Sequence, residues 1–262
     1  MDAPRNVRET ELPRTRTGNE IANPPERVFL SAVWRNLVML NFEVDPSILA
    51  PYLPTGVEID SFEGKTYISL VGFQFLRTRL YGALALPWHT NFDEVNLRFY
   101  VRRRLGDGAR RGVVFIQEIV PRRAIAWAAR WVYGENYSCC PMRHLIHSSE
   151  SSVQAEYQFK TKGNWRRLHA QASAAAALAA ENSLAEFITD YYWGYTRRGS
   201  RSFEYHVAHL RWQVRNATEF GFDGDAQALY GAAFARVLSG PPASAFIAEG
   251  SEVEVFAGRL IR

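Results

Sequence analysis

FDEVNLRFYVRRRLGDGARRGVVFIQEIVPRRAIAWAARWVYGENYSCCPM, residues 92–142, is the stretch that decides the fold. Over 92–104 apolar and polar residues alternate with a period of two, which predicts a β-strand. Residues 112–120 are apolar on both faces, as is typical of a strand in the centre of a sheet. Apolar residues then recur at helical spacing over 124–131, so we expect one helix that ends at Gly134.

The composition indicates a folded protein and gives no sign of a nucleic-acid or membrane partner. Hydrophobic residues make up 47% of the 262 residues, and 31 basic against 27 acidic residues give a net charge of +4. The arginines are scattered in pairs and triplets with no nucleic-acid motif, so we expect no nucleic-acid partner. Cys139 and Cys140 are adjacent and cannot join distant segments, which favours a reducing cytoplasm. We find neither an apolar run of about 18 residues nor a signal core, so we expect no membrane partner.

The order of the patterns predicts a single α+β domain built on antiparallel sheet. Residues 1–25 are polar and lack an apolar period, so we expect a flexible N-terminal arm followed by one domain over 26–262. We expect a hairpin over 57–76, turns at 106–112 and 162–164, and a loop at 144–147. A strand or a strand pair is expected at 28–42, other strands at 153–162, 165–173, 203–217 and 252–261, and helices at 46–53, 183–192 and 225–237. The run 174–180 favours a helix by propensity alone.

One row of the strand at 92–104 carries the residues with the clearest chemical potential. Glu94, Asn96, Arg98 and Tyr100 would share one face. If that face lines a barrel interior, it supplies a carboxylate for proton transfer, an amide, and a guanidinium that binds carboxylates. If it faces water, it is an ordinary solvated sheet face, and the alternation alone leaves both interpretations open.

Glu118 interrupts an otherwise apolar strand. A buried carboxylate must be paired or protonated. Arg98 or Arg130 would serve as a structural partner, whereas a carboxylate with a raised pKa would be functional. Both interpretations remain open.

Metal and covalent sites have weaker support. His206 and His209, like His144 and His147, are three residues apart, a spacing that sends two side chains on a strand to opposite faces. We therefore expect no metal site. Cys139 has no placeable histidine partner, and neither a Gly-x-Ser-x-Gly motif nor a phosphate-binding glycine motif is present, so we expect no cofactor.

Several motifs together resemble a known family. In chain order they are FDEVNLRFYVRR, GVVFIQEIV, AARWVYGENY, SLAEFITDYYWGYT and YHVAHLRWQV. This series looks like the YqjF-like uncharacterised family, which is itself similar to acetoacetate decarboxylase. The resemblance covers the chain from about Arg27 to Ile261. It implies an antiparallel β-barrel or cone-like sheet with helices packed outside and a pocket down its centre.

The resemblance also implies a difference at the catalytic position. Decarboxylases of that superfamily carry a Schiff-base lysine in a Gly-Phe-Pro-Lys-Lys run. The matching loop here is 134–139, where Tyr137 or Ser138 takes the place of the lysine, and neither forms an imine. The pocket glutamate of the decarboxylase matches Glu94.

Two functions from different classes follow. The first is a lysine-independent enzyme acting on a small keto, hydroxy or carboxylate compound by enolisation, dehydration, cyclisation or an aldol-type step. In it Arg98 holds an anionic group, Glu94 moves a proton and Tyr137 donates to an oxyanion. Further substrate-binding candidates are Asn96, Glu118, Trp88, Trp127 and Ser138.

The second is a binding or sensing protein that holds a small hydrophobic or acidic metabolite with Arg98 and the tryptophans Trp34, Trp88 and Trp127. A structural subunit of a homo-oligomer is a third hypothesis, and it predicts a filled barrel without a cavity. In the first two hypotheses the partner is a small molecule.

Overall fold

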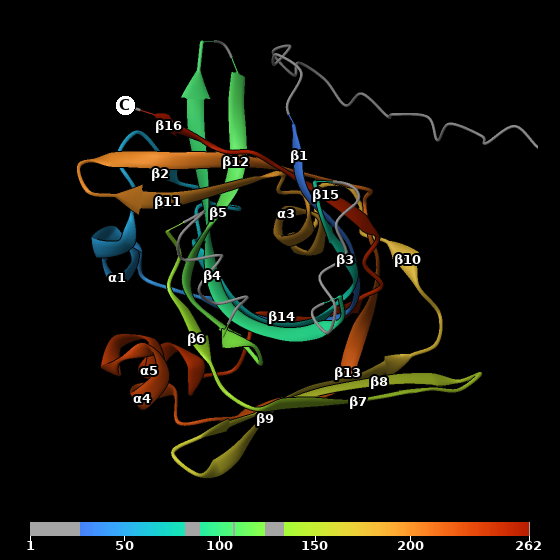
Figure 1. Ribbon diagram of the computed structural model, residues 1–262. Coiled ribbons are helices and arrows are strands. Elements are labelled where there is room, and N and C mark those ends of the chain that lie inside the picture. Colours follow the sequence, from blue (N-terminus) through green and yellow to red (C-terminus); the bar gives the residue numbers. More distant parts are fainter. Residues whose placement is uncertain (1–26, 82–89, 107, 124–133, 262) are drawn as a thin grey trace, which may run out of the picture.

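The structure is a computed structural model and describes residues 27–81, 90–106, 108–123 and 134–261 (Figure 1). The expected arm at 1–25 and the expected helix at 124–131 lie outside these residues. Within the described ranges no helix is both long enough and apolar enough to cross a membrane.

Sheet dominates the described chain, as the alternating patterns predict. The strands are β1 Val28–Glu43, β2 Glu58–Ile59, β3 Tyr67–Leu80, β4 Phe92–Leu105, β5 Gly108–Val120, β6 Tyr137–Cys139, β7 Met142–Ser148, β8 Ser152–Thr161, β9 Asn164–Ser173, β10 Ala177–Leu178, β11 Trp193–Arg198, β12 Arg201–His209, β13 Gln213–Asp223, β14 Ser244–Ala248, β15 Glu252–Phe256 and β16 Arg259–Ile261. The helices are α1 Pro46–Leu49, the 3-10 turn Ala50–Tyr52, α3 Leu184–Thr189, α4 Ala226–Tyr230 and α5 Ala232–Leu238.

Seven of the described strands close a ring in the order β1, β3, β4, β5, β11, β12, β15 and back to β1. Its neighbours are antiparallel except β5 and β11, which meet in parallel over two residue pairs, Trp193 with Gly112 and Gly194 with Val113. The predicted fold class is therefore confirmed as a cone-like, mostly antiparallel sheet. The parallel contact makes it a mixed sheet rather than a clean barrel.

Strand β1 belongs to the ring and to a second sheet at once. Its first half pairs with β15 over Val28–Val33, and its second half pairs with β14 over Leu37–Asn41. A bulge separates the halves, and there Asn36 adopts a positive φ of 56°, a conformation that asparagine tolerates better than most residues. From β14 the sheet continues through β13, β9, β8 and β7.

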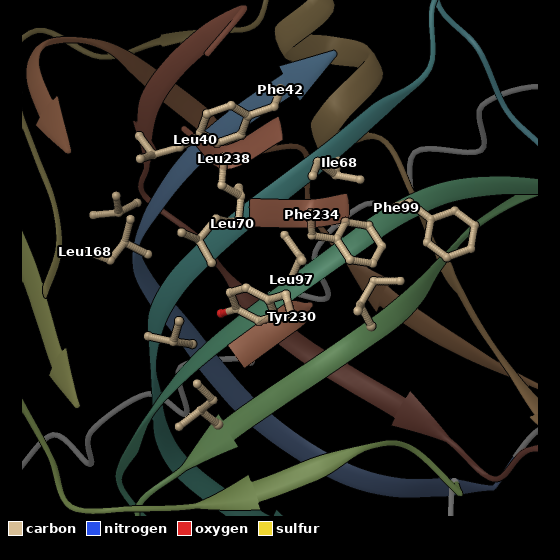
Figure 2. Packing of buried hydrophobic residues seen from close by; sticks show 14 of the residues in the cluster. Leu40, Phe42, Ile68, Leu70, Leu97, Phe99, Leu168, Tyr230, Phe234 and Leu238 are labelled. Atoms are coloured by element: carbon tan, nitrogen blue, oxygen red, sulfur yellow. The ribbon is translucent and has the colours of Figure 1, made fainter. Parts of the chain in front are cut away.

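This second sheet covers the outer face of the ring. Apolar side chains of β1, β3 and β4 pack there against Tyr157, Phe159 and Leu168 of β8 and β9 in one buried cluster. Phe234 of α5 and Tyr230 of α4 join it, and Figure 2 shows both among the leucines and phenylalanines of the ring strands. Each fully buried side chain of this size contributes about 1.5 to 3 kcal/mol to folding.

The helices lie on both sides of the ring wall. α4 and α5 pack outside, as expected. α3 lies within the ring of strands in Figure 1, and its Phe187 and Ile188 pack in a second, inner cluster with Tyr100 and Val71. The N-cap half of the predicted capping box forms, because Ser183 Oγ accepts from the Glu186 backbone N–H. The Glu186 carboxylate accepts from the backbone N–H of Asn182, one residue before the N-cap.

Several local predictions are wrong for non-local reasons. The turn at Glu63-Gly64 forms with a single bridge from Phe62 to Lys65, but β2 pairs with β4 instead of β3. The segment 144–147 is strand β7 rather than a loop. The alanine-rich run forms the two-residue strand β10, since pairing with β13 overrides helix propensity.

Boundaries differ elsewhere. The strand expected at 203–217 is two strands, β12 and β13, and β14 was not anticipated. The helix expected at 225–237 is divided at Gly231, whose φ of 87° is not helical. The turn expected at 106–112 is shorter, because β5 already begins at Gly108.

Candidate active site

Strand β4 carries one row of polar side chains on the inner side of the ring. Glu94, Asn96 and Arg98 are 2%, 1% and 8% exposed, and Tyr100 continues the row into the inner apolar cluster. The alternate row, which starts at Val95, packs in the outer cluster. Both faces of β4 are buried, so the alternative of a solvated polar face is wrong.

Strand pairing adds two more residues to this inner wall. Asn96 lies directly opposite Glu118 of β5, and Glu118 lies opposite Tyr137 of β6. Residues directly opposite each other project from the same face of a sheet. Glu118 and Tyr137 are 2% and 8% exposed. Three adjacent strands therefore bring Glu94, Asn96, Glu118 and Tyr137 to one buried surface.

A third carboxyl group, Glu135, reaches the same surface from the segment before β6. Gly134 leads into it with a positive φ of 75°, which favours glycine. The Tyr205 hydroxyl of β12 donates to Glu135 Oε1 over 2.5 Å. Burial raises the pKa of Glu135 to about 7, although hydrogen bonds from Tyr205 and Glu118 and the charge of Arg198 oppose the shift.

Glu94 is the carboxyl group of the β4 row. Its Oε1 accepts a hydrogen bond of 2.9 Å from Asn96 Nδ2. Burial raises the pKa of Glu94 to about 8, and the negative charge of Glu135 acts in the same direction, while Asn96 and Arg98 lower it. Glu94 is therefore able to give and take a proton near neutral pH.

Glu118 is held largely in its protonated form. Burial raises its pKa well above the ordinary value, and the charges of Glu135 and Glu94 raise it further. The Tyr137 hydroxyl hydrogen-bonds to Glu118, and burial also raises the pKa of Tyr137, which keeps that hydroxyl a donor. Glu118 in turn hydrogen-bonds to Glu135, so the two carboxyl groups share a proton.

Three polar atoms of this wall lack a hydrogen-bond partner among the described residues. They are Asn96 Oδ1, Arg98 Nε and Glu118 Oε2. The guanidinium of Arg98 lies 5.8 Å from the centre of the Tyr100 ring. A buried polar group without a partner costs about 1 to 3 kcal/mol. A ligand that forms hydrogen bonds with these three atoms removes that cost and gains binding free energy.

A short polar chain stands behind Arg98. Ser69 Oγ donates to Asn41 Oδ1 over 2.6 Å and lies 2.5 Å from the Tyr100 hydroxyl. Asn41 Nδ2 donates to Ser244 Oγ over 3.0 Å. Because the Ser69 proton is used toward Asn41, the Tyr100 hydroxyl donates to Ser69. This chain fixes the hydroxyl end of Tyr100, over whose ring the Arg98 guanidinium lies.

Not every predicted site residue joins this group. Ser138 follows Tyr137 on β6, and its hydroxyl accepts from Gln117 and donates to the Glu118 carbonyl oxygen. Neighbouring residues of a strand point to opposite faces, which separates Ser138 from the carboxyl groups. Trp88 and Trp127 lie outside the described residues.

Trp34, the third tryptophan of the binding hypothesis, packs elsewhere in the inner cluster. It is in edge contact with Phe73, Phe75 and Trp212. It lies on β1, and its neighbour Phe73 on β3 is directly opposite Glu94 of β4.

The sequence prediction missed Glu135 and Tyr205. They are 70 residues apart and meet only because β12 closes the ring. A signal exists in Gly194, opposite Tyr205 on β11: a Cβ built there would lie 2.1 Å from Tyr205 Cζ. A glycine in a strand marks the close approach of another group.

The three lysines of the chain are all described, and none reaches the carboxyl groups. Lys65 forms an ion pair of 2.8 Å with Glu43 at the surface. Lys160 is exposed on β8, and Lys162 lies in the turn to β9 with a φ of 47°. We find no lysine beside Glu94 or Tyr137.

His206 and His209 have partners within the fold. His206 stacks between Trp193 and Phe256. His209 has both ring nitrogens near backbone carbonyl oxygens, those of Leu210 and Tyr191. Among the described residues no group of three His, Cys, Asp or Glu side chains is arranged to hold a metal ion.

A groove of about 360 Å³ lies on the outer side of the ring, separate from the carboxyl groups. His144 Nδ1 and Asp93 Oδ1 are 2.8 Å apart in its wall, and Gln74 Nε2 lies 3.2 Å from His144 Nε2. Because Gln74 Oε1 accepts from Asn36, its amide donates to the imidazole. Both ring nitrogens of His144 are thus satisfied, and the pair joins β7 to the ring.

Solved structures with a similar fold include an acetoacetate decarboxylase, an acetoacetate decarboxylase-like enzyme and an enzyme of enduracididine biosynthesis. The chain is similar to acetoacetate decarboxylase from Legionella pneumophila at 10% identity and a TM-score of 0.63, over 95% of this chain and 93% of that one. It is similar to the enduracididine biosynthesis enzyme MppR at 14% identity and a TM-score of 0.62, over 93% of this chain and 90% of that one.

An acetoacetate decarboxylase-like enzyme from Sphingomonas wittichii RW1 matches at 12% identity and a TM-score of 0.60, over 97% of this chain and 99% of that one. At these identities the likeness concerns the fold. It confirms the fold expected from the resemblance to acetoacetate decarboxylase.

The comparison of sequences confirms the resemblance to the YqjF-like family. The uncharacterised protein YqjF of Bacillus subtilis (strain 168) is 25% identical over 187 residues, which are 70% of this chain and 74% of YqjF. The model of the family DUF2071, described as an uncharacterised conserved protein, matches residues 31–252. The chain therefore belongs to the DUF2071 family.

Proposed function

We propose that this protein is a small-molecule enzyme that works by acid/base chemistry without a Schiff-base lysine. Its substrate is a keto, hydroxy or carboxylate compound, and the reaction is an enolisation, dehydration, cyclisation or aldol-type step. The observation that carries the proposal is the set of three buried carboxyl groups, Glu94, Glu118 and Glu135, on one inner wall. Groups that exchange protons near neutral pH are concentrated at active sites.

The roles follow from protonation and position. Arg98 binds the anionic group of the substrate through a guanidinium whose Nε has no partner among the described residues. Glu94 moves a proton between carbon and oxygen. Tyr137, whose pKa is raised by burial, stays protonated and donates to a developing oxyanion or, through Glu118, to the carboxyl pair.

Glu135 sets the protonation of the other two carboxyl groups. Its charge raises the pKa of both Glu94 and Glu118. Where neighbouring titratable groups have different pKa values, the difference decides which group acts as acid and which as base. In the proposed enzyme Glu118 and Glu135 hold one proton between them, and Glu94 is the group that gives and takes the proton of the substrate.

The alternative is a binding or sensing protein that uses the same inner wall without chemistry. Arg98 is buried beside apolar side chains of the inner cluster and could bind the anionic end of a metabolite. This observation supports the binding protein as well as it supports the enzyme. What favours the enzyme is Glu94, because a binding site for an anion gains nothing from a carboxyl group beside the guanidinium.

Proton exchange in D2O separates the two. A panel of small 2-oxo, 2-hydroxy and 3-hydroxy acids is incubated with the protein, and proton NMR follows the loss of C–H signals and the appearance of new products. The proposal predicts exchange or turnover that Glu94→Gln abolishes while ligand affinity is retained. Binding with neither exchange nor turnover in the natural protein establishes the alternative, and full activity of Glu94→Gln contradicts the assigned role.

A further inference from the structure

The three polar atoms without partners on the inner wall form a pattern of their own. Asn96 Oδ1, Arg98 Nε and Glu118 Oε2 belong to residues that are 1%, 8% and 2% exposed. Buried polar groups in folded proteins are nearly always hydrogen-bonded. Three such atoms on two neighbouring strands indicate the hydrogen-bonding groups of the molecule that completes them.

Their positions limit the size of that molecule. Asn96 and Glu118 are directly opposite each other, so their Cβ atoms are about 5 Å apart. Arg98 is the next residue of the same row, about 7 Å along β4. One group of the ligand reaches both Asn96 and Glu118, and a second group a few atoms away reaches Arg98.

Two of the three atoms are acceptors. The Asn96 amide nitrogen is used toward Glu94, so only Oδ1 is left, and turning the amide over would break that bond. The proton of Glu118 is used toward Glu135, so Oε2 is also left as an acceptor. Arg98 Nε, in contrast, is a donor. The wall offers a pair of acceptors next to one cationic donor.

Resting on the proposed function, we infer that the ligand is a small carboxylic acid with a hydroxyl or amino group near its carboxylate. The carboxylate lies on Arg98, a hydroxyl group donates its one proton to Asn96 Oδ1 or Glu118 Oε2, and an ammonium group donates to both. A simple oxo acid has acceptors only and leaves both protein acceptors unpaired. One unpaired buried acceptor weakens binding about tenfold.

Matched ligands with one carbon skeleton test this. The probes are propanoate, pyruvate, lactate and alanine, and the same four functional patterns on 4-methylpentanoate, whose branched end adds apolar contact. Affinities are measured by calorimetry and by thermal stabilisation of the natural protein at pH 7. We expect lactate, alanine or their longer analogues to bind at least about tenfold more tightly than the oxo and unsubstituted acids. Comparison of the hydroxy acids with the amino acids shows whether the site prefers an O–H or an N–H donor.

Variants assign the preference to the wall. Asn96→Leu removes one acceptor and should reduce the preference for the donor-bearing acid, whereas Arg98→Met should weaken all four acids together. If Asn96→Leu does not fold, Glu118→Met removes the other acceptor. Equal affinity of the natural protein for oxo and hydroxy or amino acids overturns the inference, as does the absence of binding by all eight probes. Donor-selective binding without exchange or turnover leaves this inference intact and instead contradicts the proposed enzyme.

Discussion

Glu118 and Glu135 are hydrogen-bonded to each other inside the ring, although one belongs to β5 and the other comes before β6. Two buried carboxyl groups in contact cannot both ionise, so they hold one proton between them. The Tyr205 hydroxyl of β12 donates to Glu135 Oε1. This pair, together with Glu94, gives the inner wall its acid/base character.

Removal of the Tyr205 hydroxyl should change the pH dependence of the site. The Tyr205 hydrogen bond lowers the pKa of Glu135 against the effect of burial, so Tyr205→Phe should raise that pKa and move the pH profile of proton exchange upward. Tyr195→Phe makes the same change on the neighbouring strand β11, near Glu204, and should leave the profile in place. An unchanged profile in Tyr205→Phe would contradict the role of this hydrogen bond.

Stability should fall as the pH rises through the neutral range. Glu94 and Glu135 have folded pKa values of about 8 and about 7 against an ordinary value of 4.5. The folded state therefore binds more protons than the unfolded state between these limits. Their contribution is complete below pH 4.5 and is lost as the pH rises through 7 and 8.

Denaturant unfolding of Glu94→Gln from pH 4.5 to 9 checks this. The variant should lose less stability than the natural protein over that range, by on the order of 5 kcal/mol. Gln keeps an oxygen that accepts from Asn96. Glu63→Gln in the exposed turn is the control and should follow the natural protein. Parallel curves for all three proteins would show that Glu94 does not titrate as described.

Reductive trapping should find no imine. With all three lysines away from the carboxyl groups, incubation with pyruvate and borohydride should leave every lysine peptide unmodified by mass spectrometry. Acetoacetate decarboxylase treated in parallel provides the positive control, because decarboxylases of that superfamily carry a Schiff-base lysine. A stoichiometric adduct on Lys65, Lys160 or Lys162 would overturn the proposed chemistry.

Gly194→Ala should damage the ring where Tyr205 crosses β11. The new methyl group would meet the buried Tyr205 ring at 2.1 Å, and overpacking of this kind costs about 1 to 3 kcal/mol. Gly240→Ala, where a Cβ would lie 3.4 Å from the nearest atom, should be tolerated. Equal melting temperatures of the two variants would contradict the prediction, because they would mean that the Tyr205 ring is not held against position 194.

The sequence predicts the row on β4 well and its surroundings poorly. Alternation over 92–104 places Glu94, Asn96 and Arg98 on one face, because a strand has a fixed period of two. That both faces are buried depends on a sheet formed more than 50 residues later, where Tyr157 and Leu168 cover the outer row. Local pattern holds no information on that contact.

The same reason explains the missed residues. Glu135 and Tyr205 meet through the closure of the ring, and a hydrogen bond across 70 residues leaves no periodic trace. The turn at 63–64 was correct as a local structure, yet β2 pairs with β4 because turn geometry does not choose the sheet partner. The family resemblance supplied the cone-like fold, which alternation alone predicts only as antiparallel sheet.

The most direct test is an NMR titration of the glutamate side-chain carboxyl carbons in protein labelled with carbon-13. Glu94→Gln and Glu135→Gln assign the two signals by their disappearance. We predict that the Glu94 and Glu135 signals shift with midpoints near pH 8 and 7, respectively, far from the ordinary value of 4.5. Midpoints near 4.5 for both groups would contradict an acid/base site on this wall.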